Sequence, residues 1–239
     1  MNIFSGLSLF FNANRLKPIC KTAFSSKPSL DNAVKDISSK LKNPSSSNLA
    51  LVFISSHFAS DFPRLLPLLK KRIKAEIWLG CATCSVFFIK DEGIMDENQN
   101  SPSLSVTLLT LPQTKLIPFH IPEKSKFDLD NPSKVWTENT DNNIISATSG
   151  LIFIDPSTEM INDLISSFDF VFPKCNLIGG IGSHHSSSHG SLFFDDKVCK
   201  GSVGILMEGD WRLETLVTKG VKPIGPILEV ESVKKNILL

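Results

Sequence analysis

One order of elements occurs twice along the chain, and this repetition limits the fold more than any other feature. Each round predicts a strand, a helix and a second strand, followed by strands without helices. In the first round the strands are expected at 49–54 and 75–79, with the helix at 60–73 between them. In the second round the strands are expected at 151–154 and 177–178, with the helix between them from Ser157 or Thr158 to Phe170. The order predicts an α+β fold with two similar halves. In it, mixed and largely antiparallel sheets form a layered sandwich, and helices pack on the outside.

A further helix is predicted ahead of the first round, at 29–42. Its apolar residues recur at helical spacing and form one stripe. Ser29 stands where a cap is expected, Asp31 falls in the first turn, and Asn43-Pro44 ends the helix because proline disfavours helical geometry at the residue before it. The stripe consists of Leu30, Ala33, Val34, Ile37 and Leu41.

The remaining segments are predicted from short apolar runs and from turn residues. Strands are expected at 86–89, 104–111, 115–121 and 213–217, and two more, at 191–194 and 203–207, are expected to pair around Asp195-Asp196. The stretch 122–143 is polar and contains prolines, which predicts a long solvated connection.

Composition excludes several classes of protein. The 239 residues carry 25 Lys and Arg against 24 Asp and Glu, and a net charge of +1 gives no field that would attract nucleic acid. The longest apolar run covers 49–54, far short of the roughly 20 residues that cross a bilayer. Five scattered cysteines, an odd number, favour a reducing interior over a disulfide framework.

Residues 1–28 contain basic residues and serines but no acidic residue, since Asp31 is the first in the chain. This composition is typical of an organelle transit peptide, and it predicts a disordered leader. A secretory signal is disfavoured because the apolar stretch Ile3–Phe11 comes before the basic residues. We expect import into a plastid, with a mitochondrion as the alternative, and a cytoplasmic protein if the segment is an ordinary N-terminus.

Cys81-Ala-Thr-Cys84 is a C-x-x-C motif that follows a predicted strand. A redox pair needs a helix N-terminus to lower the pKa of one thiol, and here a strand follows instead. A zinc site needs a second cysteine pair, which Cys175 and Cys199 do not form. A tight turn of small residues is therefore the preferred interpretation, and a thiol enzyme remains an alternative.

A second concentration of unusual residues is Gly179-Gly-Ile-Gly-Ser183, followed by His184, His185 and His189. The glycines predict a sharp turn after a strand, with backbone N–H groups open to a small ligand. The motif is neither a P-loop nor a dinucleotide fingerprint, and the histidines lack the helical spacing of a metalloprotease. We expect no metal, no cofactor and no catalytic residue here.

Four stretches resemble the N-terminal half of FIST proteins in the order of that family. They are Leu49–Ser55, Trp78–Val86, Leu177–Gly182 with Ser191–Phe194, and Val217–Pro226. The last resembles the family's Q-G-C-R-P-I-G-P signature, although Lys219 and Val221 replace its glutamine and cysteine. Ser85 stands where the family tends to have glycine.

The resemblance implies a sensory module for small ligands, such as amino acids or their derivatives, and no enzymatic activity. The alternative is a substrate-recognition module of an F-box ubiquitin ligase, with a SKP1-type adaptor as partner. Neither a nucleic acid nor a membrane is expected as a partner. The predicted ligand-binding residues are Gly80, Cys81, Thr83, Cys84, Ser85, Gly179, Gly180, Ser183, Lys219, Gly220 and Pro223.

The resemblance gives a FIST N domain over 29–226, with a polar linker near 122–143. Family members continue beyond it into a C-terminal FIST half, so we expect 227–239 to begin a missing or truncated half. This last stretch is compatible with a helix, because Glu229 and Glu231 stand early in it and Lys234 and Lys235 late.

Overall fold

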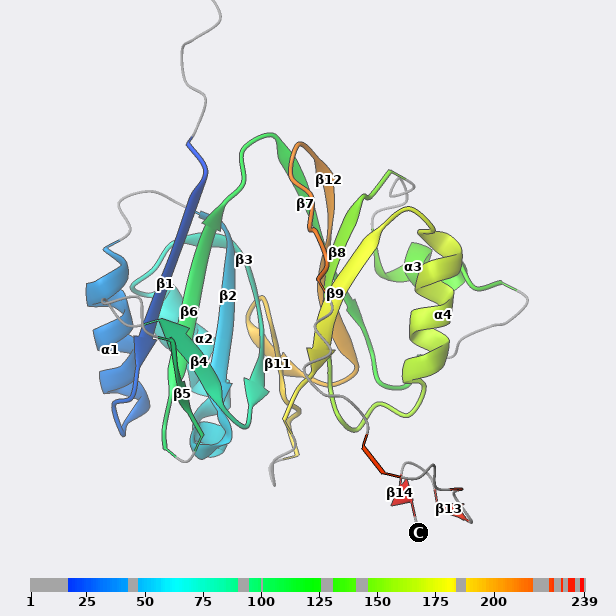
Figure 1. Ribbon diagram of the computed structural model, residues 1–239. Coiled ribbons are helices and arrows are strands. Elements are labelled where there is room, and N and C mark those ends of the chain that lie inside the picture. The colour runs from blue at the N-terminus through cyan, green and yellow to red at the C-terminus, as the bar shows by residue number, and fades with distance from the viewer. Residues whose placement is uncertain are drawn as a thin grey trace, which may run out of the picture.

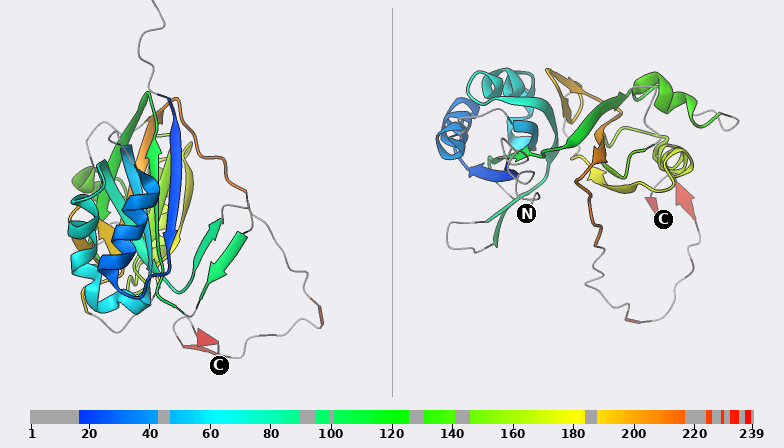
Figure 2. Two further views of the ribbon diagram at one scale, coloured as in Figure 1. Left: turned by 90° about the vertical axis from the view of Figure 1, so that its left-hand side faces the viewer. Right: turned by 90° about the horizontal axis from the view of Figure 1, so that it is seen from above.

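The protein is a four-layered sandwich of two sheets covered by helices (Figures 1 and 2). The computed structural model describes residues 17–42, 47–89, 95–99, 101–125, 131–140, 146–183, 188–216, 224–225, 229, 232–234 and 237–238. The predicted α+β class, with mixed and largely antiparallel sheets, is confirmed. No helix of the described part is long and apolar enough to cross a bilayer.

Sheet 1 has six strands and sheet 2 has four. Sheet 1 runs in the order β1 (Ile19–Ser25), β6 (Leu104–Thr110), β2 (Ser47–Ser55), β3 (Ala75–Thr83), β10 (Leu192–Phe194) and β11 (Lys197–Cys199). Sheet 2 runs in the order β7 (Thr114–Ile121), β12 (Ser202–Gly209), β8 (Ser149–Ile154) and β9 (Asn176–Ile181). The pairs β2–β3 and β8–β9 are parallel, and every other pair in the two sheets is antiparallel.

Helices cover the outer face of each sheet. Sheet 1 packs against α1 (Leu30–Leu41) and α2 (Phe62–Lys70), which follows the 3₁₀ turn Ser56–Asp61. Sheet 2 packs against α3 (Lys134–Asn139) and α4 (Ile161–Val171). The prediction for α1 is confirmed: its whole apolar stripe is buried, and the Ser29 hydroxyl accepts a hydrogen bond from the Asn32 N–H at 3.4 Å.

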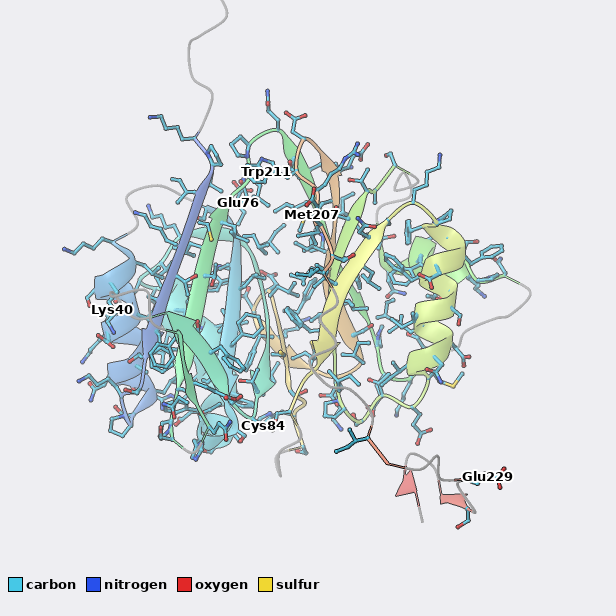
Figure 3. The ribbon with its side chains drawn as sticks, in the orientation of Figure 1. Lys40, Glu76, Cys84, Met207, Trp211 and Glu229 are labelled. Carbon is cyan, nitrogen blue, oxygen red and sulfur yellow. The ribbon has the colours of Figure 1, made fainter. Side chains whose placement is uncertain are left out.

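A third core lies between the sheets, built by the strand side chains that point away from the helices. Leu79 of β3 and Leu192 of β10 meet Val203, Ile205 and Met207 of β12 there. Met207 lies between the two sheets in Figure 3. Because strand side chains alternate between faces, β2, β3, β8 and β12 are buried on both faces, which explains their continuous apolar sequences.

The two predicted similar halves are confirmed as two copies of one arrangement. The first half, residues 19–110, orders its strands β1-β6-β2-β3, and the second half, residues 114–209, orders them β7-β12-β8-β9 with the same directions. The register matches too, because Val52 pairs with Gly80 and Ile152 pairs with Gly179. Phe53 and Phe153, each the next residue, contact one another edge to face at 5.5 Å across the sheets.

The halves differ in the hairpins inserted before their last strands. The hairpin β10–β11 of the second half extends sheet 1, where β10 pairs with β3. The hairpin of the first half, β4 (Val86–Ile89) with β5 (Met95–Asn98), forms a separate two-stranded sheet (Figure 2). The predicted pairing of 191–194 with 203–207 is therefore wrong: β10 turns at Asp195-Asp196 into β11, and β12 lies in the other sheet.

Two further expectations, on the connection 122–143 and on the start of α4, are corrected by the structure. The stretch 122–143 contains α3, whose Trp136 is buried against Phe119, Phe168 and Phe172, so this part is not a solvated connection. The sequence of the stretch is mostly polar, and its few apolar residues do not recur at helical spacing, so no periodicity marks the helix. Helix α4 begins at Ile161, and neither Ser157 nor Thr158 caps it, because Ser157 binds Asp155 instead.

The expected last strand at 213–217 is also wrong over its described part, since residues 211–216 have no regular structure. In the final stretch the predicted helix is contradicted by β13 (Val233–Lys234) and β14 (Ile237–Leu238), which pair with each other. At the other end of the chain, β1 lies within the segment 1–28 that was expected to be a leader.

Candidate functional site

The residues of the C-x-x-C motif do not form the predicted turn, because β3 continues to Thr83. Gly80 and Cys81 are therefore strand residues in the centre of sheet 1. A Cβ added at Gly80 would lie 1.9 Å from the Val52 carbonyl oxygen, so the glycine allows close pairing of β2 and β3. Cys81 is buried between the sheets, and burial raises the pKa of its thiol to about 12.

The predicted glycine turn is likewise a strand, because β9 includes both Gly179 and Gly180. Gly179 repeats the role of Gly80, since its added Cβ would lie 1.9 Å from the Ile152 carbonyl oxygen. Gly180 differs from both, because its Cβ would have nothing within 4 Å. The chain leaves the strand at Gly182, three residues later than the sequence suggested.

Two of the predicted site residues, distant in sequence, meet where β3 and β9 end. The Cys84 Sγ lies 3.1 Å from the Ser183 Oγ, and the Ser183 N–H donates to the Ala82 carbonyl at 2.8 Å. Cys84 lies at the lower end of β3 in Figure 3. Thr83 adds a buried hydroxyl that has no hydrogen-bond partner in the described part. Because Cys84 and Ser183 follow equivalent strands, the junction joins the carboxyl ends of β3 and β9, one strand from each half.

The other predicted site residues lie at different places. Ser85 is half-buried between β3 and β4. Lys219, Gly220 and Pro223 lie outside the described residues, as do His184 and His185. Within the described part, no group of three or more His, Cys, Asp or Glu side chains is arranged to hold a metal ion.

Sequence reasoning missed Asp155, a buried carboxylate that links the end of β8 in sheet 2 to the start of β10 in sheet 1. It follows β8 and is only 3% exposed. Its Oδ2 accepts the N–H and the hydroxyl of Ser191, both at 2.7 Å, and its Oδ1 accepts the N–H and the hydroxyl of Ser157. Burial would raise the pKa of Asp155, but these hydrogen bonds outweigh it and hold the pKa below its ordinary value.

The Asp155 contacts connect the site to sheet 1. Ser191 directly precedes β10, and its carbonyl accepts the Ala82 N–H of β3 at 2.7 Å. The equivalent residue in the first half is Ser55, whose hydroxyl accepts the Ser103 N–H at 3.0 Å. The signal that could have identified Asp155 in the sequence is an acidic residue at the end of a predicted strand, at the position where the other half has a serine.

A hollow of about 430 Å³ lies at the beginning of α4, beside the loop that follows Asp155. Its wall includes Ser157, Glu159, Asn162 and Ile181. No side chain caps α4, so its first N–H groups have no intrahelical partner and point toward this end of the helix. The hollow therefore combines backbone N–H groups that no described side chain caps with an exposed carboxylate, that of Glu159.

The arrangement gives little support for thiol chemistry. A nucleophilic or redox cysteine needs a lowered pKa, whereas burial raises the pKa of Cys81 to about 12. The pKa of Cys199 is raised to about 12 as well, mainly by burial and further by the Asp155 carboxylate. Cys84 is exposed, but its contact within hydrogen-bond reach is a serine hydroxyl and not a cation.

Comparison with known families matches residues 48–239 to the FIST N domain. A search of curated proteins found no match. The matched range begins at β2 and includes the β3–β9 junction, Asp155 and the hollow beside α4. FIST domains act as sensory, signal-transduction modules. Because the match covers well over half of the sequence, the chain belongs to the FIST family.

Proposed function

We propose that this protein senses a small zwitterion, an amino acid or a close derivative, in the hollow at the beginning of α4. The observation that carries the proposal is the pairing of free helix N–H groups with the Glu159 carboxylate around a space of about 430 Å³. A helix N-terminus favours a carboxylate, and Glu159 attracts an ammonium group. A purely anionic ligand is disfavoured because Asp163 lies in the first turn of α4.

The position of the hollow supports a sensory role. Ser157 in its wall binds Asp155, and Asp155 holds Ser191 at the start of β10. A ligand that moves Ser157 thus acts on the contact that joins sheet 2 to sheet 1. Ligand binding is then coupled to the relative arrangement of the two sheets, where Cys84 and Ser183 meet.

A thermal-shift screen with the common amino acids tests the proposal. A ligand that binds only the folded state at a hundred times its Kd adds about 2.7 kcal/mol of stability, which is a rise of several degrees in Tm. The active compound should lose its effect on Glu159→Gln and keep it on Glu76→Gln. Glu76 is an exposed residue of β3 at the opposite end of the sheets, as Figure 3 shows. The absence of any shift, or a shift that Glu159→Gln leaves unchanged, would overturn the proposal.

We further propose import into a plastid, with a mitochondrion as the alternative, directed by the N-terminal segment. Since β1 begins at Ile19 and pairs along its whole length with β6, cleavage of the leader should fall before Ile19. Mass spectrometry of the imported protein checks the cleavage site. An N-terminus within or after β1, or a full-length protein in the cytoplasm, would contradict this.

A further inference from the structure

The two parallel strand pairs end differently at their outer edges. In sheet 1 the edge of β3 is covered by β10, which pairs Leu192 with Cys81, Phe193 with Gly80 and Phe194 with Leu79. Phe193 is fully buried there and packs on Phe62 of α2, with ring centroids 5.2 Å apart. The edge of β3 is therefore a docking site for a strand that carries a large aromatic residue.

The equivalent edge of β9 has no paired strand among the described residues, and the Asn176 side chain at its start donates to the Leu213 carbonyl at 3.1 Å. Within the described part of the chain, β9 pairs with β8 alone and is the last strand of sheet 2. Gly179 and Gly180 are exposed, and the side chain of Ile181 is 59% exposed. A groove of about 460 Å³ runs along this edge, with Ile165 and Asp169 of α4 on one side and Thr215 on the other. A bare edge beside an open groove has the geometry that accepts an added strand.

The chain contains a second copy of the segment that fills the edge of β3. Ser191-Leu-Phe-Phe194 leads into the hairpin β10–β11, and Ser85-Val-Phe-Phe88 leads into the hairpin β4–β5. Both segments lie between the third and the last strand of their halves. The first phenylalanine of each segment differs sharply in burial: Phe193 is 0% exposed, whereas Phe87 is 64% exposed. Phe87 thus has the sequence context of a core residue and the exposure of a surface residue.

We propose that the edge of β9 is a docking site for β4 of the same chain. The equivalence of the halves fixes the register: β4 runs antiparallel to β9, with Phe87 opposite Gly179 and Val86 opposite Gly180. Phe87 then enters the groove beside Ile165. Sheet 2 becomes β7-β12-β8-β9-β4-β5, which repeats the order of sheet 1.

One observation favours the chain's own hairpin over that of a second molecule. Cys84, two residues before β4, already lies beside Ser183, two residues beyond β9, so β4 starts next to the edge it would cover. In its present position the hairpin is held by Val86, which is buried, and by Phe88, which stacks on Phe24 of β1 with ring centroids 3.7 Å apart. The hairpin thus has two alternative positions, one against β1 and one on the edge of β9, and Cys84 and Ser85 form the hinge between them.

An engineered disulfide tests the docked register. Val86→Cys and Gly180→Cys are introduced together in a chain whose two exposed cysteines are first replaced by serine, Cys20→Ser and Cys84→Ser. The open space around Gly180 accommodates the new side chain. Mild oxidation should link most of the protein within single chains, as shown by peptide mass spectrometry and a non-reducing gel. Val86→Cys with Asn98→Cys, partners within the hairpin, is the positive control, and Val86→Cys with Thr137→Cys on α3 is the negative control.

Hydrogen exchange provides a second readout without cysteines. Phe87→Asp should accelerate exchange of residues 176–181 about tenfold and lower the Tm by no more than a few degrees, because only the docked hairpin is lost. Phe170→Asp, at another exposed aromatic residue, should change neither. The proposal is overturned if the hairpin control forms its disulfide but positions 86 and 180 do not, if they link only between chains, or if Phe87→Asp leaves exchange unchanged. Neither measurement uses a ligand, so the result is independent of the proposed function.

Discussion

The first and second halves share one topology but differ in what surrounds it. The first half receives β10–β11 on the edge of β3, whereas the second half receives nothing on the edge of β9 within the described part of the chain. The second half in turn has a buried carboxylate, Asp155, where the first has Ser55. The two halves thus share one order of four strands. They differ in the hairpin that joins sheet 1, in the open edge of β9 and in the Asp155 contact at the start of β10.

The largest expected difference between the halves concerns their matching glycines. Gly80→Ala should cost more than about 4 kcal/mol, because the new Cβ would lie 1.9 Å from the Val52 carbonyl in a strand held on both sides. In Gly179→Ala the new Cβ would lie equally close, 1.9 Å, to the Ile152 carbonyl oxygen. Because β9 is an edge strand and can shift, we expect Gly179→Ala to lose less than about half of the stability that Gly80→Ala loses. Urea unfolding measures both, and equal losses would show that β9 is held as firmly as β3.

The next effect separates the two matching phenylalanines. Phe193→Ala should destabilise the protein by about 4 kcal/mol, because it removes a fully buried ring that packs on Phe62. Phe87→Ala should cost no more than about 1 kcal/mol, because its ring is 64% exposed in the structure and becomes buried only when β4 docks on β9. The same unfolding experiment measures both variants, and a loss for Phe87→Ala as large as that for Phe193→Ala would show that the two rings are equally buried in solution.

A smaller difference is expected at the equivalent residues Asp155 and Ser55. Asp155→Ala should cost about 3 kcal/mol because it leaves the buried N–H of Ser191 without its acceptor, whereas Ser55→Ala should cost about 1 kcal/mol. Since the pKa of Asp155 is lowered, its contribution is present above the unfolded pKa of about 4 and is lost as the pH falls through the folded value.

A pH series checks that sign. The stability difference between the unmodified protein and Asp155→Asn should be largest near neutral pH and shrink as the pH falls below about 4. A difference that grows toward acid would contradict the hydrogen-bonded carboxylate.

The smallest effect concerns the ion pairs that tie the β10–β11 turn to the first half. Lys70 of α2 contacts the carboxylates of Asp195 and Asp196, and both aspartates are well exposed. Lys70→Ala should cost about 0.5 to 1 kcal/mol at low salt, and 1 M NaCl should remove most of the difference, because exposed pairs are weak and screened. A loss that salt does not change would assign Lys70 a packing role instead.

The sequence alone determined the elements whose signals are local. The stripe of α1, its Ser29 cap, the strands β2 and β8 and the repetition of the two halves all follow from periodicity, capping chemistry and runs of branched residues. The sequence also marked Cys84 and Ser183, although the turns that were expected to hold them are strands. Glycine is ambiguous in sequence, because it suits both a turn and a strand that needs close approach.

Only the tertiary structure decided which segments meet. The attachment of β10–β11 to the sheet of the other half, the burial of Trp136 and the contact of Asp155 with Ser191 each join residues far apart in the chain. Phe87 and Phe193 show the reason most clearly: nearly identical neighbours in sequence give one exposed ring and one buried ring. Local residues set the conformation of a strand, but burial depends on whether a complementary edge is within reach, and that is a property of the whole fold.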